Sequence, residues 1–140
     1  MSPKLNTTAI IKTLTSQIDS IQGIYLFGSF ALNQATTNSD IDIAILCPTQ
    51  LDKSLKLNTK EILETTLNKN VDLVEIRFIN TIFQEEIIIT AKRIATIDKM
   101  ACELFEDYVY CSAMDFREFI KPHMKDIINK GTVYGRGHTK

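Results

Sequence analysis

Three aspartates are the residues of this chain whose spacing most directly indicates chemistry. Asp40 and Asp42 are separated by one isoleucine at the start of an apolar run, and Asp72 interrupts a second apolar run. Because side chains alternate across a strand, Asp40 and Asp42 should share one face, with Cα atoms about 6.6 Å apart. Unpaired carboxylates in a buried strand are costly, but a pair at this separation can share one or two hard cations. Mg²⁺ bound there would complete its coordination with phosphate oxygens and water, so the pattern suits a nucleoside triphosphate site.

The Gly28-Ser29 pair offers the complementary half of such a site. Directly after an apolar strand, Gly28 lets the backbone turn and approach a ligand closely. Ser29 and the amides that follow can donate hydrogen bonds to phosphate at the start of a short helix over residues 30–33. Ser39 is placed to steady the polar turn before Asp40. Each feature alone is more often a plain turn or a solvated strand edge, so the functional prediction depends on their combination.

The elements that must position these residues alternate between helix and strand. A helix between two strands suggests a crossover connection, and an apolar run that carries acids on alternate positions should bury only its other face. The periodicities predict a helix capped by Asn6, Thr7 or Thr8 that ends near Gly23, strands over 24–27, 40–46 and 71–76, helices over 50–69 and from Asn80 or Thr81, an edge strand over 93–97, and a long helix over 98–121 that Pro122 stops.

Size and composition favour one compact domain. The chain has 140 residues, of which 44% are hydrophobic and 24% charged, enough for a single core. We expect residues 1–121 to form that domain and residues 122–140 a basic C-terminal helix or tail. A net charge of -1 argues against holding long nucleic acid through bulk electrostatics.

Neither export nor membrane insertion is indicated by the sequence. No run of roughly 18 apolar residues occurs, and the first residues carry no apolar leader. The three cysteines are an odd number at spacings that fit neither a disulfide framework nor a zinc site. We therefore expect reduced, buried thiols and a cytoplasmic protein.

The order Gly28-Ser29, ten residues, Asp40-Ile41-Asp42 and a later Asp72 resembles the signature of the DNA polymerase beta-like nucleotidyltransferase superfamily. More narrowly, over about residues 8 to 120, the chain is similar to the minimal nucleotidyltransferases of the MntA type. These are antitoxins paired with a HEPN ribonuclease toxin of the HepT type. The resemblance implies an α+β nucleotidyltransferase fold, with a small mixed β-sheet flanked by helices and a long C-terminal helix.

The resemblance also implies a reaction and a set of site residues. ATP would be the substrate and two Mg²⁺ ions the cofactors, and AMP would be transferred to a tyrosine hydroxyl of the toxin, which neutralises it. Asp40 and Asp42 would bridge both ions, and Asp72 would bind the ion that activates the acceptor hydroxyl. We expect nucleotide contacts from Gly28, Ser29, Ser39 and Arg77.

The chain departs from the family pattern in one place. Relatives often read Gly-Ser-Phe-Ala-Arg-Gly, whereas Leu32 and Asn33 occupy the last two positions here. Leu32 removes a cation that could have met phosphate or a partner, and Asn33 is a mild change because asparagine tolerates the left-handed conformation.

Two alternatives to this reaction stay open. A non-catalytic antitoxin could cover its toxin with the long helix, although such an apolar stripe more often packs on its own sheet. A transferase could instead act on a small hydroxylated compound, but little chain is left to shape that acceptor site. The helix stripe in question consists of Phe105, Tyr108, Val109, Phe116 and Phe119.

Overall fold

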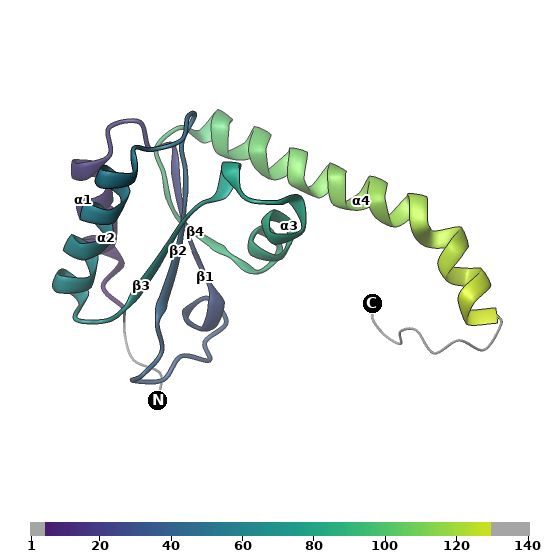
Figure 1. Cartoon of the computed structure of the whole chain (residues 1–140), viewed down its shortest axis with the longest axis horizontal. Helices are drawn as coiled ribbons and strands as arrows, with labels where there is room; N and C mark the ends of the chain where they lie inside the picture. Colours follow the sequence, from purple (N-terminus) through teal and green to yellow (C-terminus); the bar gives the residue numbers. More distant parts are fainter. Residues whose placement is uncertain (1–4, 130–140) are drawn as a thin grey trace.

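A computed structural model describes residues 5–129, and for residues 115–129 it describes the helical backbone only. Four strands form one sheet in the order β3-β2-β1-β4 (Figure 1). The central pair, β1 (Gly23–Phe27) and β2 (Ile41–Leu46), is antiparallel. The edge strand β4 (Lys92–Thr96) lies antiparallel to β1, and β3 (Val71–Glu75) lies parallel to β2. The sheet is therefore mixed, which confirms the α+β fold class expected from the sequence.

Two helices cover each face of the sheet. α1 (Thr7–Gln17) and α2 (Lys53–Leu67) lie on one face, and α3 (Thr81–Thr90) and the first part of α4 (Lys99–Asn129) lie on the other (Figure 1). Since α2 connects the parallel strands β2 and β3, it is the crossover that the sequence predicts.

The central strand β2 is buried on both faces. Ile41, Ile43 and Ile45 belong to the core cluster under α1 and α2, whereas Ala44 and Leu46 belong to the cluster under α3 and α4. The expectation that the aspartate-bearing face would stay uncovered along the whole strand is therefore wrong. The helices α3 and α4 cover that face, and only the beginning of β2, where the aspartates lie, is left open.

Most helix starts agree with the sequence, but two helix ends do not. Asn6 caps α1 by accepting a hydrogen bond from the Ala9 amide at 3.0 Å, and Asn80 caps α3 in the same way from Phe83 at 2.9 Å. α1 ends at Gln17 rather than near Gly23, because Ile18 is extended and fully buried in the core.

The second difference is at the C-terminal end of α4. The helix runs to Asn129 and does not stop at Pro122, so it crosses the predicted domain boundary. A proline fixes φ at a helical value and removes one amide donor, so it can kink a helix without ending it. The basic residues 130–140 lie outside the described residues. None of the described helices combines the length and apolarity needed to cross a bilayer.

Only part of the apolar stripe that the sequence predicts on the long helix faces the sheet. Phe105 and Val109 are buried against the sheet, whereas Tyr108 is 59% exposed. The side chains of Phe116 and Phe119 lie outside the described ones. Packing on the chain's own sheet thus explains the first two residues but not Tyr108.

The three cysteines are free thiols. Cys47 and Cys102 are buried as predicted, whereas the prediction of a buried thiol is wrong for Cys111, which is exposed on α4. Burial raises the pKa of the Cys47 thiol, which makes it a poor nucleophile.

Candidate active site

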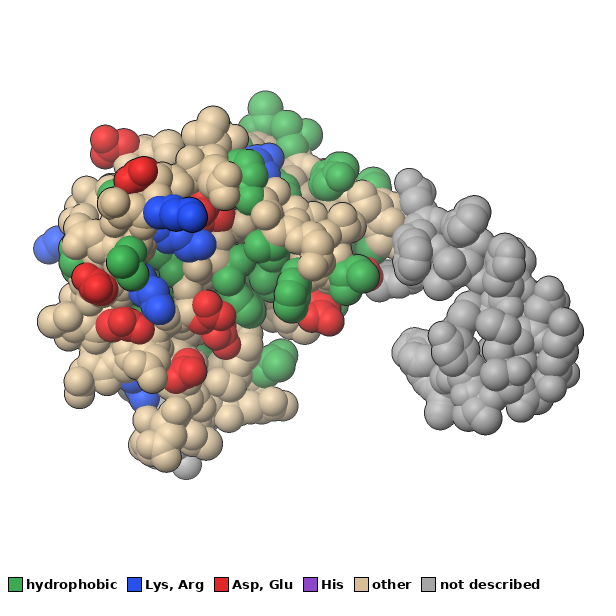
Figure 2. All heavy atoms as spheres, viewed as in Figure 1, with side chains coloured by type: hydrophobic (Ala, Val, Ile, Leu, Met, Phe, Trp, Pro, Cys, Tyr) green, Lys and Arg blue, Asp and Glu red, His purple; other side chains and the backbone are tan. Residues whose placement is uncertain are grey.

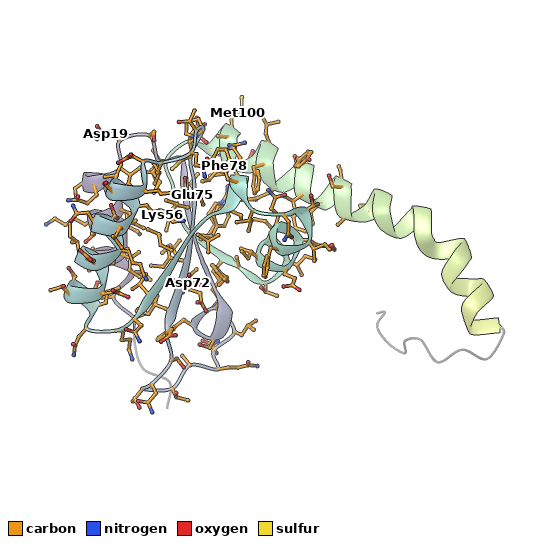
Figure 3. The ribbon with its side chains drawn as sticks, viewed as in Figure 1. Asp19, Lys56, Asp72, Glu75, Phe78 and Met100 are labelled. Atoms are coloured by element: carbon orange, nitrogen blue, oxygen red, sulfur yellow. The ribbon has the colours of Figure 1, made fainter. Side chains whose placement is uncertain are left out.

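Two of the three aspartates lie opposite each other on neighbouring parallel strands. Asp42 of β2 is the register partner of Asp72 of β3. Asp42 lies two residues before Ala44 and Asp72 two residues before Val74, and side chains two apart on a strand share a face. Because Ala44 and Val74 pack under α3 and α4, both aspartates point to that face of the sheet. Asp40 comes immediately before β2, and it is exposed, like Asp72. The structure thus brings the three carboxylates together at one end of the sheet, and Figure 3 shows Asp72 there.

The charges of the three aspartates interact. The pKa of Asp42 is raised above its usual range, first by burial and then by the negative charges of Asp72 and Asp40. Asp42 is only half-buried, yet like charges on both sides make its ionised form unfavourable. A cation, or a hydrogen-bond donor, brought to this cluster would relieve that repulsion.

Gly28 lies against the Asp42 carboxylate. Phe27 is the register partner of Asp42 across β1 and β2, so the residue after Phe27 passes directly over the acid. A Cβ atom built on Gly28 would collide with the Asp42 carboxylate, and the φ angle of Gly28 is +74°. Both observations require glycine here, one for space and one for backbone conformation.

The Gly28-Ser29 turn is a 3₁₀ helix, Gly28–Phe30, which begins two residues earlier than the predicted short helix. Its end is fixed by the Gln34 amide, which donates to the Ser29 carbonyl at 2.9 Å. Asn33 adopts a φ of 57°, the left-handed conformation that this position needs where relatives have glycine. The first amides of a helix have no partner within it, so this turn presents donors near Asp42.

Ser39 has the role in the turn that the sequence predicts for it. Its hydroxyl accepts a hydrogen bond from the Thr36 amide at 2.8 Å, and its own amide donates to the Thr36 carbonyl at 3.1 Å. The Lys69 ammonium donates to the Thr37 carbonyl at 2.7 Å and ties this loop to the start of β3. Ser39, Asp40 and Lys69 line a polar cavity of about 370 Å³.

Sequence reasoning missed Lys69 and the apolar residues of α3 that border the aspartates. A signal for Lys69 existed, since it is a cation three residues before Asp72. Phe83 of α3 lines a second cavity next to Asp72, but its distance from the motif along the sequence gave no such signal.

The carboxylates fit a magnesium site by their chemistry. Among the described residues, no three His, Cys, Asp or Glu side chains are grouped as the ligands of one metal ion. Mg²⁺, however, uses only one or two protein carboxylates and fills its octahedron with phosphate oxygens and water. The opposed pair Asp42 and Asp72, with the added charge of Asp40, meets that requirement.

The structure does not bring Arg77 to the aspartates. Its Nε donates to the Cys47 carbonyl at 2.9 Å, its NH2 group donates to Gln22 Oε1 at 3.0 Å, and its guanidinium lies 5.4 Å from the centre of the Phe105 ring. These partners lie at the far end of β2 and β3, where Figure 3 labels Phe78. A strand advances about 3.3 Å per residue, so Glu75 lies roughly 10 Å along β3 from Asp72, and Arg77 follows beyond it in the 3₁₀ helix Ile76–Phe78. The predicted nucleotide contact of Arg77 is therefore corrected to a structural one.

Glu75 also has a structural environment. Its Oε1 accepts a hydrogen bond from the Leu51 amide at 2.7 Å, and its Oε2 lies 3.7 Å from the Lys56 ammonium. Its position on β3 alternates away from Asp72, toward the start of α2.

Comparison with known proteins places this geometry in a family. Residues 8–100 match the family model described as Polymerase beta, Nucleotidyltransferase. The chain is 36% identical over 91 residues to the protein adenylyltransferase MntA of Shewanella oneidensis, and the match covers 65% of this chain. The chain spans 66% of the length of that curated relative.

Solved structures agree over more of the chain. A crystal structure of a toxin-antitoxin with AMP-PNP matches with a TM-score of 0.74 and 30% identity, covering 89% of this chain and 99% of that one. A structure of the tri-AMPylated Shewanella oneidensis HEPN toxin in complex with an MNT antitoxin matches with a TM-score of 0.66 and 27% identity. That match covers 86% of this chain and 94% of the other.

Proposed function

The chain belongs to the polymerase beta nucleotidyltransferase family, and on that premise we propose that it is an antitoxin that transfers AMP from ATP to a tyrosine hydroxyl of a HEPN ribonuclease toxin. The observation that carries the proposal is the opposition of Asp42 and Asp72 beside the Gly28-Ser29 turn. The relative named as a protein adenylyltransferase supports the reaction, and the neighbour with an AMPylated HEPN toxin supports the acceptor.

Each residue of the site has one task in this proposal. The amides and hydroxyl at Gly28 and Ser29 bind the β and γ phosphates, and Ser39 shapes the loop next to Asp40. Asp40, Asp42 and Asp72 are the residues that would hold two Mg²⁺ ions, which supply charge neutralisation and polarisation of the α-phosphate when bound.

The transfer itself is an in-line displacement. The acceptor oxygen forms a bond to the α-phosphorus while the bond to the bridging oxygen of pyrophosphate breaks, and the acceptor proton passes toward the Asp72 carboxylate. The protein contributes mainly alignment, which is worth much of the barrier in such reactions. The proposed site of action is the cytoplasm, where ATP is available, and the net charge of -1 favours a reaction in which this chain binds no nucleic acid.

A second candidate is an antitoxin that only covers its toxin. The observation that favours it is an outer stripe on α4, formed by Met100 at 71%, Leu104 at 63% and Tyr108 at 59% exposure. These residues recur every four positions and so share one side of the helix. An apolar stripe left in water is typical of an interaction surface.

Mass spectrometry of the toxin after co-expression separates the two candidates. With the wild-type chain, we expect the toxin to gain the mass of one or more AMP groups. With Asp42→Asn, which keeps the shape of the side chain, the added mass should disappear. An inhibited toxin without added mass beside the wild-type chain would contradict the transferase and support the covering antitoxin.

A further inference from the structure

An apolar cavity opens directly beside Asp72, between the sheet and α3. Its volume is about 370 Å³, and its walls are formed by Phe27, Leu32, Val74, Ile79, Phe83 and Ile87. Asp72 and Glu86 are the charged residues among its described lining, which contains no lysine or arginine. The cavity therefore repels phosphate, and it suits an uncharged, mainly apolar group with a hydrogen-bond donor to offer.

The rim of this cavity is more apolar than the fold requires. Leu32 is 48% exposed and Phe83 is 54% exposed, and neither side chain belongs to a core cluster. Core packing therefore does not explain why these two positions are apolar. Figure 2 shows hydrophobic side chains gathered over this region, with acidic side chains next to them. A group that entered the cavity would remove part of this surface from water.

We propose that this cavity receives the aromatic ring of the acceptor tyrosine, with its hydroxyl directed at Asp72. The inference rests on the proposed function and names the residues that select a phenol for it. The acceptor oxygen must come close to Asp72, because the α-phosphorus that it attacks would lie over the cluster that Asp72 forms with Asp40 and Asp42. In a phenol this oxygen is bonded directly to the ring, so the ring must lie next to Asp72, where the cavity is.

The adenine base of ATP fits the cavity less well. A ribose separates adenine from the α-phosphorus, so the base need not lie beside the acceptor oxygen. Adenine also has several ring nitrogens that accept hydrogen bonds, whereas the described lining is mostly apolar and its Thr90 hydroxyl already donates to the Glu86 carbonyl at 2.9 Å. Polar atoms buried without partners are costly, so this lining favours a phenol ring.

Leu32 would contact the tyrosine ring in this cavity. It occupies the position at which relatives often have arginine, and here it forms part of the cavity wall. A leucine at this position extends the apolar contact for an aromatic ring, whereas a guanidinium would bring a charge to it. The departure from the family pattern then concerns the acceptor and not the phosphates.

The test is the kinetics of AMP transfer by Phe83→Ala to the purified cognate toxin, with radiolabelled ATP at saturation. Phe83 is half exposed, so its loss leaves the core intact. Removal of one apolar wall should raise the KM for the toxin about tenfold and change kcat by less than about twofold.

Leu32→Ala should raise the KM for the toxin as well. Ile82→Ala is the matched control, because Ile82 is the adjacent residue of α3, is 72% exposed and lies outside the cavity.

Binding of AMP-PNP to the same variants shows whether the cavity receives the tyrosine ring or the adenine base. An unchanged Kd for AMP-PNP, together with the raised KM for the toxin, supports the acceptor pocket. A Kd weakened as much as the KM would place adenine in the cavity and overturn the inference, as would a Phe83→Ala enzyme that equals the wild type in both measurements. Failure of the proposed function is read separately, as absence of transfer by the wild-type chain, and it would overturn this inference as well.

Discussion

Asp42 is the residue at which the components of the candidate site meet. It faces Asp72 across β2 and β3, follows Asp40 by two positions, and has the backbone of Gly28 against its carboxylate. An acid in these surroundings is unfavourable for folding in its ionised form. Such a carboxylate fits the proposed function, because a bound cation would relieve this charge repulsion.

The first prediction concerns the pH dependence of stability. The folded-state pKa of Asp42 is raised above 3.8, so ionisation of Asp42 disfavours the folded state, and this cost grows as the pH rises through that raised pKa. Asp42→Asn should therefore raise the free energy of unfolding at pH 7, and the gain should shrink as the pH falls toward 3.8. Urea denaturation at a series of pH values measures it.

The exposed Asp19, far from the cluster in Figure 3, provides the control, and the free energy of unfolding of Asp19→Asn at pH 7 should match that of the wild type. A less stable Asp42→Asn protein at pH 7, or a difference that does not vary with pH, would contradict the electrostatic explanation.

The second prediction concerns Gly28. Gly28→Ala places a Cβ atom on the Asp42 carboxylate at a φ of +74°, so it should lower the free energy of unfolding by about 1–3 kcal/mol. Asn33→Gly is the control, because Asn33 already has a positive φ and glycine accepts it, and its effect should stay below about 1 kcal/mol. Thermal unfolding compares the two. Equal stability of Gly28→Ala and the wild type would show that the turn does not need glycine.

At the residue scale, the sequence predicted the aspartates and the glycine turn, because their chemistry is local to two strands and one bend. Arg77 could not be assigned in this way. Its type suits phosphate, but its position depends on the direction of β3, which carries the chain away from the aspartates. A residue type indicates what a side chain can bind, whereas strand direction decides what it meets.

At the scale of elements, Arg77 joins three segments. It binds the end of β2 through the Cys47 carbonyl, the segment before β1 through Gln22, and α4 through the Phe105 ring. This cluster fixes the end of the sheet opposite the aspartates, and it attaches the base of the long helix.

The third prediction follows from that cluster. Arg77→Ala leaves two acceptors without their donor and should lower the free energy of unfolding by about 1–3 kcal/mol. Arg77→Lys should recover little of this, because an ammonium cannot reproduce the two-sided guanidinium contact. Chemical denaturation measures both variants. The Kd for AMP-PNP should stay unchanged, and a weakened Kd with normal stability would restore Arg77 to the nucleotide site.

Element types were predictable where the apolar period was clear, whereas two ends were not. Ile18 continues the helical period of α1, yet the chain is extended there because the residue packs into the sheet. Pro122 marks a common end of helices, yet α4 continues past it. Tertiary packing explains the end of α1, and α4 shows that a proline can lie within a helix at the loss of one amide donor.

At the scale of the whole molecule, the sheet separates the site from most of the hydrophobic core. Every described buried side chain lies between Ile10 and Ala113, and α4 extends beyond this body (Figure 1). Among the described residues, α4 runs through the boundary between residues 121 and 122 without a break. That residues 1–121 form the nucleotidyltransferase domain and residues 122–140 a basic helix or tail stays a prediction.

The fourth prediction tests that division by truncation. A chain that ends after Lys121 keeps every described buried residue, so its Tm should fall by less than about 4 °C. Its Kd for AMP-PNP should equal that of the full chain, measured in parallel by calorimetry. A truncated chain that folds but no longer binds AMP-PNP would show that the basic segment belongs to the nucleotide site.

The most direct test of the central claim follows the phosphorus of ATP in a reaction with the purified toxin. Label in the α-phosphate should appear on the toxin, and label in the γ-phosphate should not. Asp42→Asn should lower the rate by roughly 1000-fold, because loss of charge neutralisation at the α-phosphate is worth several kcal/mol, while Asp19→Asn should match the wild type. Undiminished transfer by Asp42→Asn, or transfer of the γ label, would contradict the account.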